Sequence, residues 1–306
     1  MNRQLISGGI AAMMSLLITT AALAAGGGGD GGGGAPSVSA PSIDPVKRYQ
    51  EGVTALDASQ WQAARSAFSD VLKVAGTDAP TNFMMGMAWA GEGKFKESRR
   101  YFENAVRYSK GELAQARGWL GRAYIKSGDN GKVAEQKDAL VKMKSQCAGS
   151  CKDAAVIDEA IKRIDDTLAN PTAAIAPALG LPALAPAAGD AAYLAASGLI
   201  NQGRYAEALQ SLREAALVFG PHPDILTYQG FANRKLGNLT VALEFYSAAL
   251  KLQPQHRGAN EYLGEYYVEI GDLARAKAQL AKLETLCRFG CEEAYELRRW
   301  IEGRQS

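Results

Sequence analysis

Apolar residues along this chain form short runs that are separated by small and polar turn residues. Most of the glycines that begin these runs lie about 34 residues from the next one, and six of them mark the pattern: Gly52, Gly86, Gly121, Gly198, Gly230 and Gly264. Glycine at such a position lets two helices approach each other closely, because it has no side chain. A repeat of this length predicts an array of helix pairs.

One copy of the repeat is clearest, and it keeps Leu226, Gly230, Gly237, Ala242, Tyr246, Ala249 and Pro254. Small residues stand where two helices would cross, an aromatic residue fills the space between them, and a proline ends the second helix. The next copy keeps Leu263, Gly264, Tyr267, Gly271, Ala276 and Leu280. The chain therefore resembles the tetratricopeptide-repeat family. The resemblance implies an all-α binding scaffold, and it names no partner.

The repeat pattern is interrupted once, which predicts two solenoids. Residues 45–169 and 190–306 each hold about three helix-turn-helix repeats plus a closing helix, at about 153–168 and 292–302. Between them, residues 170–189 are rich in alanine and proline and predict a semi-rigid linker, or else an ordered segment packed on one half. The turn at residues 128–131 is about three residues longer than its counterpart near Gly271, so the fit of the second helix of repeat three is less certain.

The N-terminus has the pattern of an export signal. Arg3 precedes an uncharged apolar stretch over residues 5–23, and small residues precede a cleavage site ahead of Ala25. We expect a signal peptide over residues 1–24, then a flexible spacer rich in glycine, serine and proline over residues 25–44. An uncleaved anchor is the alternative. After cleavage we expect no membrane span, and the protein would be periplasmic or secreted.

The four cysteines form two CxxxC pairs, each placed before a closing helix: Cys147 with Cys151 and Cys287 with Cys291. In an exported chain this spacing favours a structural disulfide within each pair. Similar closing segments are found in exported bacterial repeat proteins, which strengthens the resemblance. The alternative is a thiol-redox or metallochaperone role for the pairs. We expect no bound metal and no cofactor, because further ligands are lacking beside the cysteines.

The family resemblance implies that exposed positions of the first helices line a groove that binds the partner. In the second half these positions are Tyr193, Ser197, Asn201, Thr227, Phe231, Arg234, Lys235, Glu261, Glu265 and Glu269. In the first half they are Tyr49, Phe83, Met87, Arg122 and Lys126. Such a set suits a protein or peptide ligand of mixed charge. The alternative is that Phe231 and Phe83 pack against the next repeat and that the three glutamates form a solvated face.

Charge and composition limit the function. A formal charge of +2 gives no strong basic surplus, so we expect no nucleic-acid partner. With two histidines in 306 residues and no glycine loop that would hold a phosphate, we expect no enzyme. The sequence therefore predicts a noncatalytic periplasmic scaffold for partner proteins, in cell-envelope assembly or protein export. It leaves the oligomeric state open.

Overall fold

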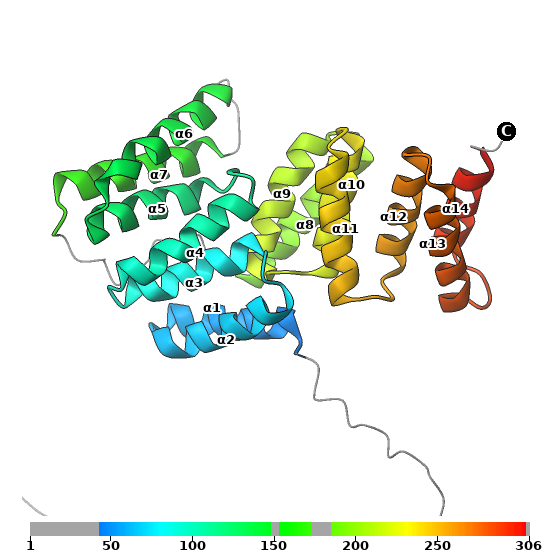
Figure 1. Ribbon diagram of the computed structural model, residues 1–306, viewed down its shortest axis with the longest axis horizontal. Helices are drawn as coiled ribbons and strands as arrows, with labels where there is room; N and C mark the ends of the chain where they lie inside the picture. The colour runs from blue at the N-terminus through cyan, green and yellow to red at the C-terminus, as the bar shows by residue number, and fades with distance from the viewer. Residues whose placement is uncertain (1–42, 148–152, 173–184, 304–306) are drawn as a thin grey trace, which may run out of the picture. The chain divides into compact units, whose positions relative to one another are not determined.

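The structure is a computed structural model that describes residues 43–147, 153–172 and 185–303. Within these ranges every regular element is helical, which confirms the all-α prediction (Figure 1). The first half contains α1 (Pro45–Asp57), α2 (Trp61–Val74), α3 (Ala79–Gly91), α4 (Phe95–Tyr108), α5 (Ala114–Ser127), the 3-10 helix η1 (Asn130–Lys132), α6 (Val133–Gln146) and α7 (Ala154–Ala169). The second contains α8 (Pro186–Asn201), α9 (Tyr205–Phe219), α10 (Pro223–Lys235), α11 (Leu239–Leu252), α12 (Arg257–Glu269), α13 (Leu273–Leu286) and α14 (Glu292–Gly303).

Polar side chains cap several of the first helices of the repeats. The Asp44 carboxylate accepts hydrogen bonds from the backbone N–H groups of Val46 and Lys47, at 3.0 and 3.1 Å. Asp78 accepts from the N–H of Thr81 at 2.8 Å. The first N–H groups of a helix have no partner within the helix, so these caps determine where α1 and α3 begin.

Three glycines of first helices lie directly against an aromatic ring of the second helix in the same repeat. The pairs are Gly52 with Phe68, Gly86 with Phe102, and Gly230 with Tyr246, and an added Cβ atom would lie 2.5 to 2.6 Å from the ring. No Cβ atom fits at that distance, so glycine is required for this helix packing. The sequence interpretation of these three glycines is confirmed.

Gly198 does not play this role. A Cβ atom added there would meet nothing within 4 Å, whereas Ala196 is fully buried in one cluster with Leu212 of α9. Ala196 precedes the turn residue Gly203 by the same interval that separates Gly230 from Gly237. The prediction for Gly198 was therefore wrong, and the close contact in repeat four is made by an alanine.

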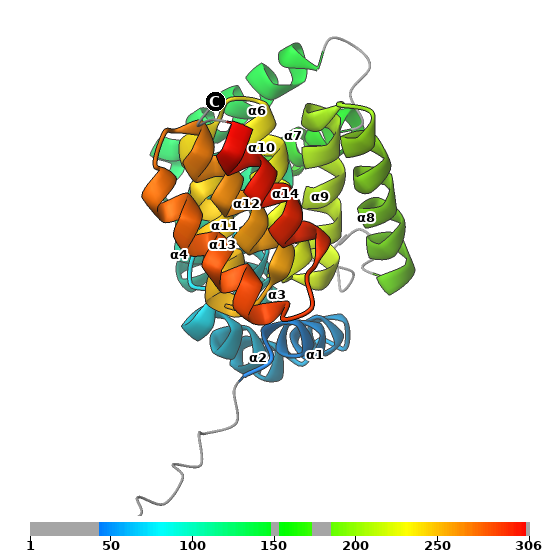
Figure 2. The same cartoon turned by 90° about the vertical axis from the view of Figure 1, so that its right-hand side faces the viewer.

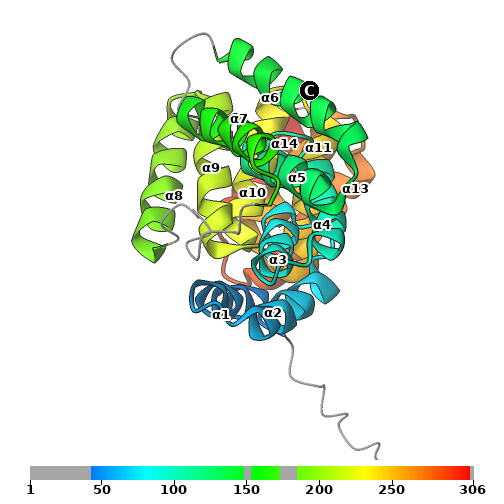
Figure 3. The ribbon, with the colours of Figure 1, turned by 90° about the vertical axis from the view of Figure 1, so that its left-hand side faces the viewer.

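The last repeat of each half is built differently from the others. A Cβ atom on Gly121 of α5 would lie 2.6 Å from Ile164 of α7, and one on Gly264 of α12 would lie 2.3 Å from Leu297 of α14. The closing helix thus contacts the glycine that elsewhere meets the second helix of the repeat. Figure 3 shows α7 beside α5, and Figure 2 shows α14 beside α12.

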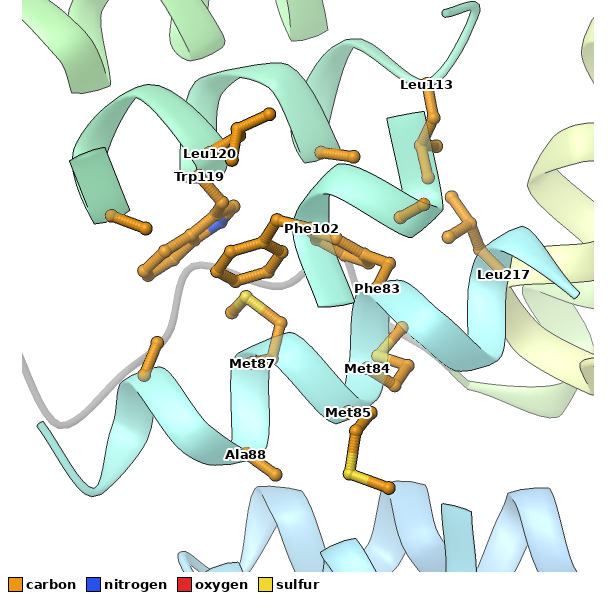
Figure 4. Packing of buried hydrophobic residues seen from close by; sticks show 14 of the residues in the cluster. Phe83, Met84, Met85, Met87, Ala88, Phe102, Leu113, Trp119, Leu120 and Leu217 are labelled. Carbon is orange, nitrogen blue, oxygen red and sulfur yellow. The ribbon is translucent and has the colours of Figure 1, made fainter. Parts of the chain in front are cut away.

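The core of the first half is rich in aromatic residues and methionine. Phe102 lies between two rings, with centroids 5.9 Å from Phe83 and 6.2 Å from Trp119. Met84 and Met87 are fully buried beside them (Figure 4). Unbranched methionine side chains fill the irregular spaces that the rings leave.

Residues of α9 complete this core. The hydroxyl of Tyr49 donates a hydrogen bond to the carbonyl oxygen of Leu217 at 2.8 Å, and the Leu217 side chain belongs to the same buried cluster as Phe83. Gly220, with φ of +70°, approaches Tyr49 so closely that a Cβ atom would lie 2.5 Å from its ring. A residue of the second half is therefore part of the hydrophobic core of the first.

Cys287 and Cys291 form the predicted disulfide, with their Cα atoms 5.7 Å apart. The bridge closes the turn between α13 and α14, in which Gly290 has a φ of +89°. The predicted pair of Cys147 and Cys151 stays a prediction, since Cys151 lies outside the described residues.

Several predicted segments lie wholly or partly outside the described residues. These are the signal peptide, most of the spacer, and residues 173–184 of the linker. At the C-terminal end of the predicted linker, α8 begins at Pro186, four residues before the predicted boundary of the second half. In the described part of the chain, none of the helices is both long and apolar enough to cross a membrane.

Substitution at two glycines separates close packing from simple helix propensity. A Cβ atom on Gly118 would lie 2.8 Å from the Ala160 Cα atom and 3.0 Å from its carbonyl oxygen, so Gly118→Ala should destabilise the fold by about 1–3 kcal/mol. Gly198→Ala is the matched control, and it should stabilise by about 0.4–1 kcal/mol. Urea denaturation measures both changes. A Gly118→Ala variant as stable as the wild type would contradict the close contact between α5 and α7.

The Cys287–Cys291 disulfide should stabilise the end of the second half. Loop closure over so short a ring predicts that Cys287→Ser/Cys291→Ser lowers the free energy of unfolding by about 2 kcal/mol. Thermal denaturation of the variant and the wild type without reductant measures the loss. A variant of unchanged stability would show that the bridge does not hold α14 in place.

Candidate partner-binding surfaces

Four of the residues predicted to face a partner are buried in the core. The exposed fractions are 0% for Tyr49, 2% for Phe83, 0% for Met87 and 3% for Thr227. Burial of the three large side chains in the packed interior stabilises the fold. The Thr227 hydroxyl donates to the carbonyl oxygen of Pro223 at 2.8 Å. These side chains offer no accessible surface, which corrects the prediction that they line a groove.

Arg234 and Glu265 are also buried, because they pair with each other. Their exposed fractions are 2% and 6%, and the Arg234 guanidinium forms an ion pair with the Glu265 carboxylate. The other terminal nitrogen of this guanidinium lies 3.3 Å from a carboxylate oxygen of Glu269. A buried charge of this kind is tolerated only when it is paired. The pair joins α10 to α12 inside the repeat array, so neither charge is free for a ligand.

The other predicted groove residues retain accessible surface. In the second half they are Tyr193, Ser197, Asn201, Phe231, Lys235, Glu261 and Glu269, and in the first half Arg122 and Lys126.

Aromatic rings and a cation gather on the second half. The Phe231 centroid lies 4.8 Å from that of Tyr262 and 6.1 Å from that of Tyr205. The Lys235 ammonium lies 5.3 Å from the Phe231 ring and 5.7 Å from the Trp300 ring. Phe231, Lys235, Tyr205, Tyr262 and Trp300 are called the second-half aromatic cluster below. The rings come from four helices: α9, α10, α12 and α14.

Several aromatic residues of these surfaces were not predicted as site residues, although the repeat carries a signal for some of them. Trp119, Tyr228 and Tyr262 all stand two positions before the glycine of their repeat. Tyr228 places its ring 5.8 Å from Tyr193. This shared position could have been recognised from the repeat. Trp300 could not, since a closing helix carries no repeat register.

Glu261 is a carboxylate held in an unfavourable environment. Burial is the main cause that raises the pKa of Glu261 to about 8, and the neighbouring carboxylates of Glu265, Glu293 and Glu296 raise it further. Among the described residues it forms no hydrogen bond or ion pair. A cation bound beside it would favour its ionised form.

Two guanidinium groups share one indole in the first half. The Arg122 and Arg163 guanidinium carbons lie 5.5 and 4.5 Å from the Trp119 ring centroid. Arg163 pairs with the largely exposed Glu159 at 2.5 Å, while the buried Nε of Arg122 has no hydrogen-bond partner among the residues that the structure describes. Burial lowers the pKa of both arginines, and the charge of Arg163 lowers that of Arg122 further. This surface is positively charged.

One group of potential metal ligands occurs in the described part of the chain. The sulfur atoms of Cys287 and Cys291 and a carboxylate oxygen of Glu293 all lie within 4.8 Å of one another. The two sulfurs are joined in the disulfide, so they do not offer thiolate ligands in this state.

The pKa of Glu261 predicts a pH-dependent stability. The folded protein holds this proton up to about pH 8, whereas the unfolded chain releases it near pH 4.5. The stabilisation is therefore fully present below pH 4.5 and is lost as the pH rises through 8. The glutamine of Glu261→Gln stays neutral at every pH. The free energy of unfolding of this variant, relative to that of the wild type, should therefore be about 1–2 kcal/mol higher at pH 9 than at pH 5. Denaturation at both values measures this. Glu97→Gln, at an exposed carboxylate, is the control, and equal pH profiles for both variants would contradict the assignment.

The chain was compared with known proteins. A family model described as tetratricopeptide repeat matches residues 83–132, 193–257 and 232–287. No curated protein matches the chain. Similar solved structures include the TPR2AB domain of yeast Sti1 in complex with pHSP90, which is 16% identical over 86% of this chain and 98% of that one, with a TM-score of 0.36. YrrB, a TPR protein with an unusual peptide-binding site, is 16% identical over 77% and 100%, with a TM-score of 0.34.

A tetratricopeptide repeat protein from Parabacteroides merdae is 14% identical over 85% of this chain and 86% of that one, with a TM-score of 0.35. Overall superposition at these TM-scores is loose, so the fold is inferred from the helix packing and the repeat match. Segments of both halves therefore match the model of the tetratricopeptide repeat.

Proposed function

We propose that this protein is a noncatalytic scaffold that binds segments of partner proteins along the first helices of its repeats. The observation that carries the proposal is the second-half aromatic cluster. Trp300 is 37% exposed and Lys235 is exposed, although both stand beside buried aromatic and charged side chains. Aromatic residues with a cation at a partly desolvated surface are typical of binding hot spots.

The surface beside the cluster is shaped to take a side chain. A shallow pocket of about 400 Å³ is lined by Glu269, Glu296, Arg299 and Trp300, with Val268 and Gly303. The Glu269 and Glu296 carboxylates pair with Arg234 and Arg299, so the pocket offers mainly an indole face for apolar contact. We therefore expect a peptide segment that carries aromatic or aliphatic residues to bind here.

We propose further that the protein works in the periplasm or outside the cell, in envelope assembly or protein export. Arg3 and the apolar stretch at residues 5–23 fit an export signal. The Cys287–Cys291 bridge fits an oxidising compartment. The two halves would present separate binding surfaces, and residues 170–189 would connect them.

The surroundings of the two histidines support a noncatalytic role. A ring nitrogen of His222 accepts the N–H of Asp224 at 3.2 Å, and one of His256 accepts the N–H of Ala259 at 3.0 Å. The other ring nitrogen of His256 lies 2.7 Å from the Asp224 carboxylate. Both imidazoles therefore act as helix caps, which leaves them poorly placed to serve as general bases.

Site-specific photo-crosslinking tests the proposal. A benzoylphenylalanine at position 235, within the second-half aromatic cluster, should capture a defined partner in cells. The same probe at Lys251, an exposed residue of the second helix α11, should not. Trp300→Ala should reduce the adduct from position 235 at least fivefold, because it removes part of the aromatic surface.

Equal adducts from positions 235 and 251, or an adduct that is unchanged by Trp300→Ala, would contradict binding at this surface. Thermal denaturation of the Trp300→Ala variant checks that the fold is retained.

A further inference from the structure

Equivalent positions in the last repeat of the two halves carry opposite charges. The residue after the repeat glycine is Arg122 in the first half and Glu265 in the second. In the closing helix, the residue before the one that contacts this glycine is Arg163 in α7 and Glu296 in α14. The aromatic residue two positions before the glycine is kept, as Trp119 and Tyr262. The same framework therefore carries two cations in one half and two carboxylates in the other, of which Glu265 is buried in its pair with Arg234.

The cationic version of this framework is compensated by other charges only in part. Among the described residues, the buried Nε of Arg122 has no hydrogen-bond partner, and Arg122 lies over the same indole as the like charge of Arg163. In the described part of the chain Arg163 pairs with Glu159, whose side chain is 57% exposed, so water competes with this ion pair. In the second half, by contrast, Glu265 is neutralised by the buried Arg234. A partly desolvated pair of guanidinium groups is stabilised by an added anion.

The indole holds both guanidinium groups near one point. The guanidinium carbons of Arg122 and Arg163 lie 5.5 and 4.5 Å from the centroid of the Trp119 ring. Arg122 belongs to α5 and Arg163 to α7. Because a buried close contact of Gly118 and Gly121 with α7 fixes the two helices, the spacing of the two arginines is set before a ligand arrives. Planar guanidinium groups bind carboxylates in a bidentate manner.

We propose that Arg122 of α5 and Arg163 of α7, whose guanidinium groups lie over the buried Trp119 ring, form a surface that binds an acidic segment of a partner protein. Carboxylates of the segment pair with the two guanidinium groups, and Lys126, whose ammonium lies 5.9 Å from the Phe95 ring, flanks the surface. The segment is a polypeptide rather than a nucleic acid, because the whole chain carries a formal charge of only +2 and a long polyanion needs more cations along its path. This inference rests on the proposed scaffold function and adds a ligand class for the first half.

Binding of a fluorescein-labelled octaglutamate peptide to the purified full chain tests the inference by fluorescence anisotropy at low salt. We expect Arg122→Gln and Arg163→Gln each to weaken binding at least fivefold, and the double variant at least twentyfold. Arg107→Gln is the matched control, since it removes one positive charge from an exposed position of α4 and should change binding less than twofold. Arg122→Lys keeps the charge and should retain part of the affinity, which separates loss of charge from loss of fold.

Absence of octaglutamate binding to the wild type, or equal losses for Arg107→Gln and Arg122→Gln, would overturn the inference. So would tighter binding of an oligothymidylate of equal charge, since the site would then favour a nucleic acid. These results leave the crosslinking from position 235 unaffected, so failure of this site is distinguishable from failure of the scaffold function.

Discussion

The close contact between a first helix and the helix packed against it is the constraint on which the rest of the structure depends. A residue without a side chain, or with a methyl group at most, brings the two helix axes together at Gly52, Gly86, Ala196 and Gly230. In the last repeats, Gly121 and Gly264 bring in the closing helices instead. Because interiors pack densely, these contacts set the positions of all side chains on the first helices.

The closing helices serve as more than caps. By packing on the repeat glycine, α7 places Arg163 beside Trp119 and Arg122, and α14 places Trp300 beside Lys235 and the Arg234–Glu265 pair. Each half therefore combines residues from a repeat with residues from outside the repeat. The combination gives the halves distinct surfaces on a shared framework, one with two guanidinium groups of which only Arg163 has an ion-pair partner among the described residues, and one with aromatic rings. Two short arrays of this kind could engage one partner at two chemically different segments.

Much of the fold could be predicted from the sequence, because the repeat period identifies helix pairs without any knowledge of their contacts. The closing helices could be predicted as well, and the Cys287–Cys291 bridge followed from the CxxxC spacing in a chain with an export signal. The register of repeat four did not, since glycine was taken as the marker and the packing residue is Ala196. The surfaces were harder to predict. Burial of Tyr49 depends on Leu217, which lies 168 positions away in the chain, and burial of Arg234 depends on its pairing with Glu265.

The central claim is that the guanidinium groups of Arg122 and Arg163 decide which segment the first half binds. Reversing the charge of the first-half site, in Arg122→Glu/Arg163→Glu, tests it most directly when octaglutamate and octalysine are titrated against the folded variant. The account predicts that octaglutamate binding is lost and that octalysine binding is gained. An unchanged preference for octaglutamate would contradict it.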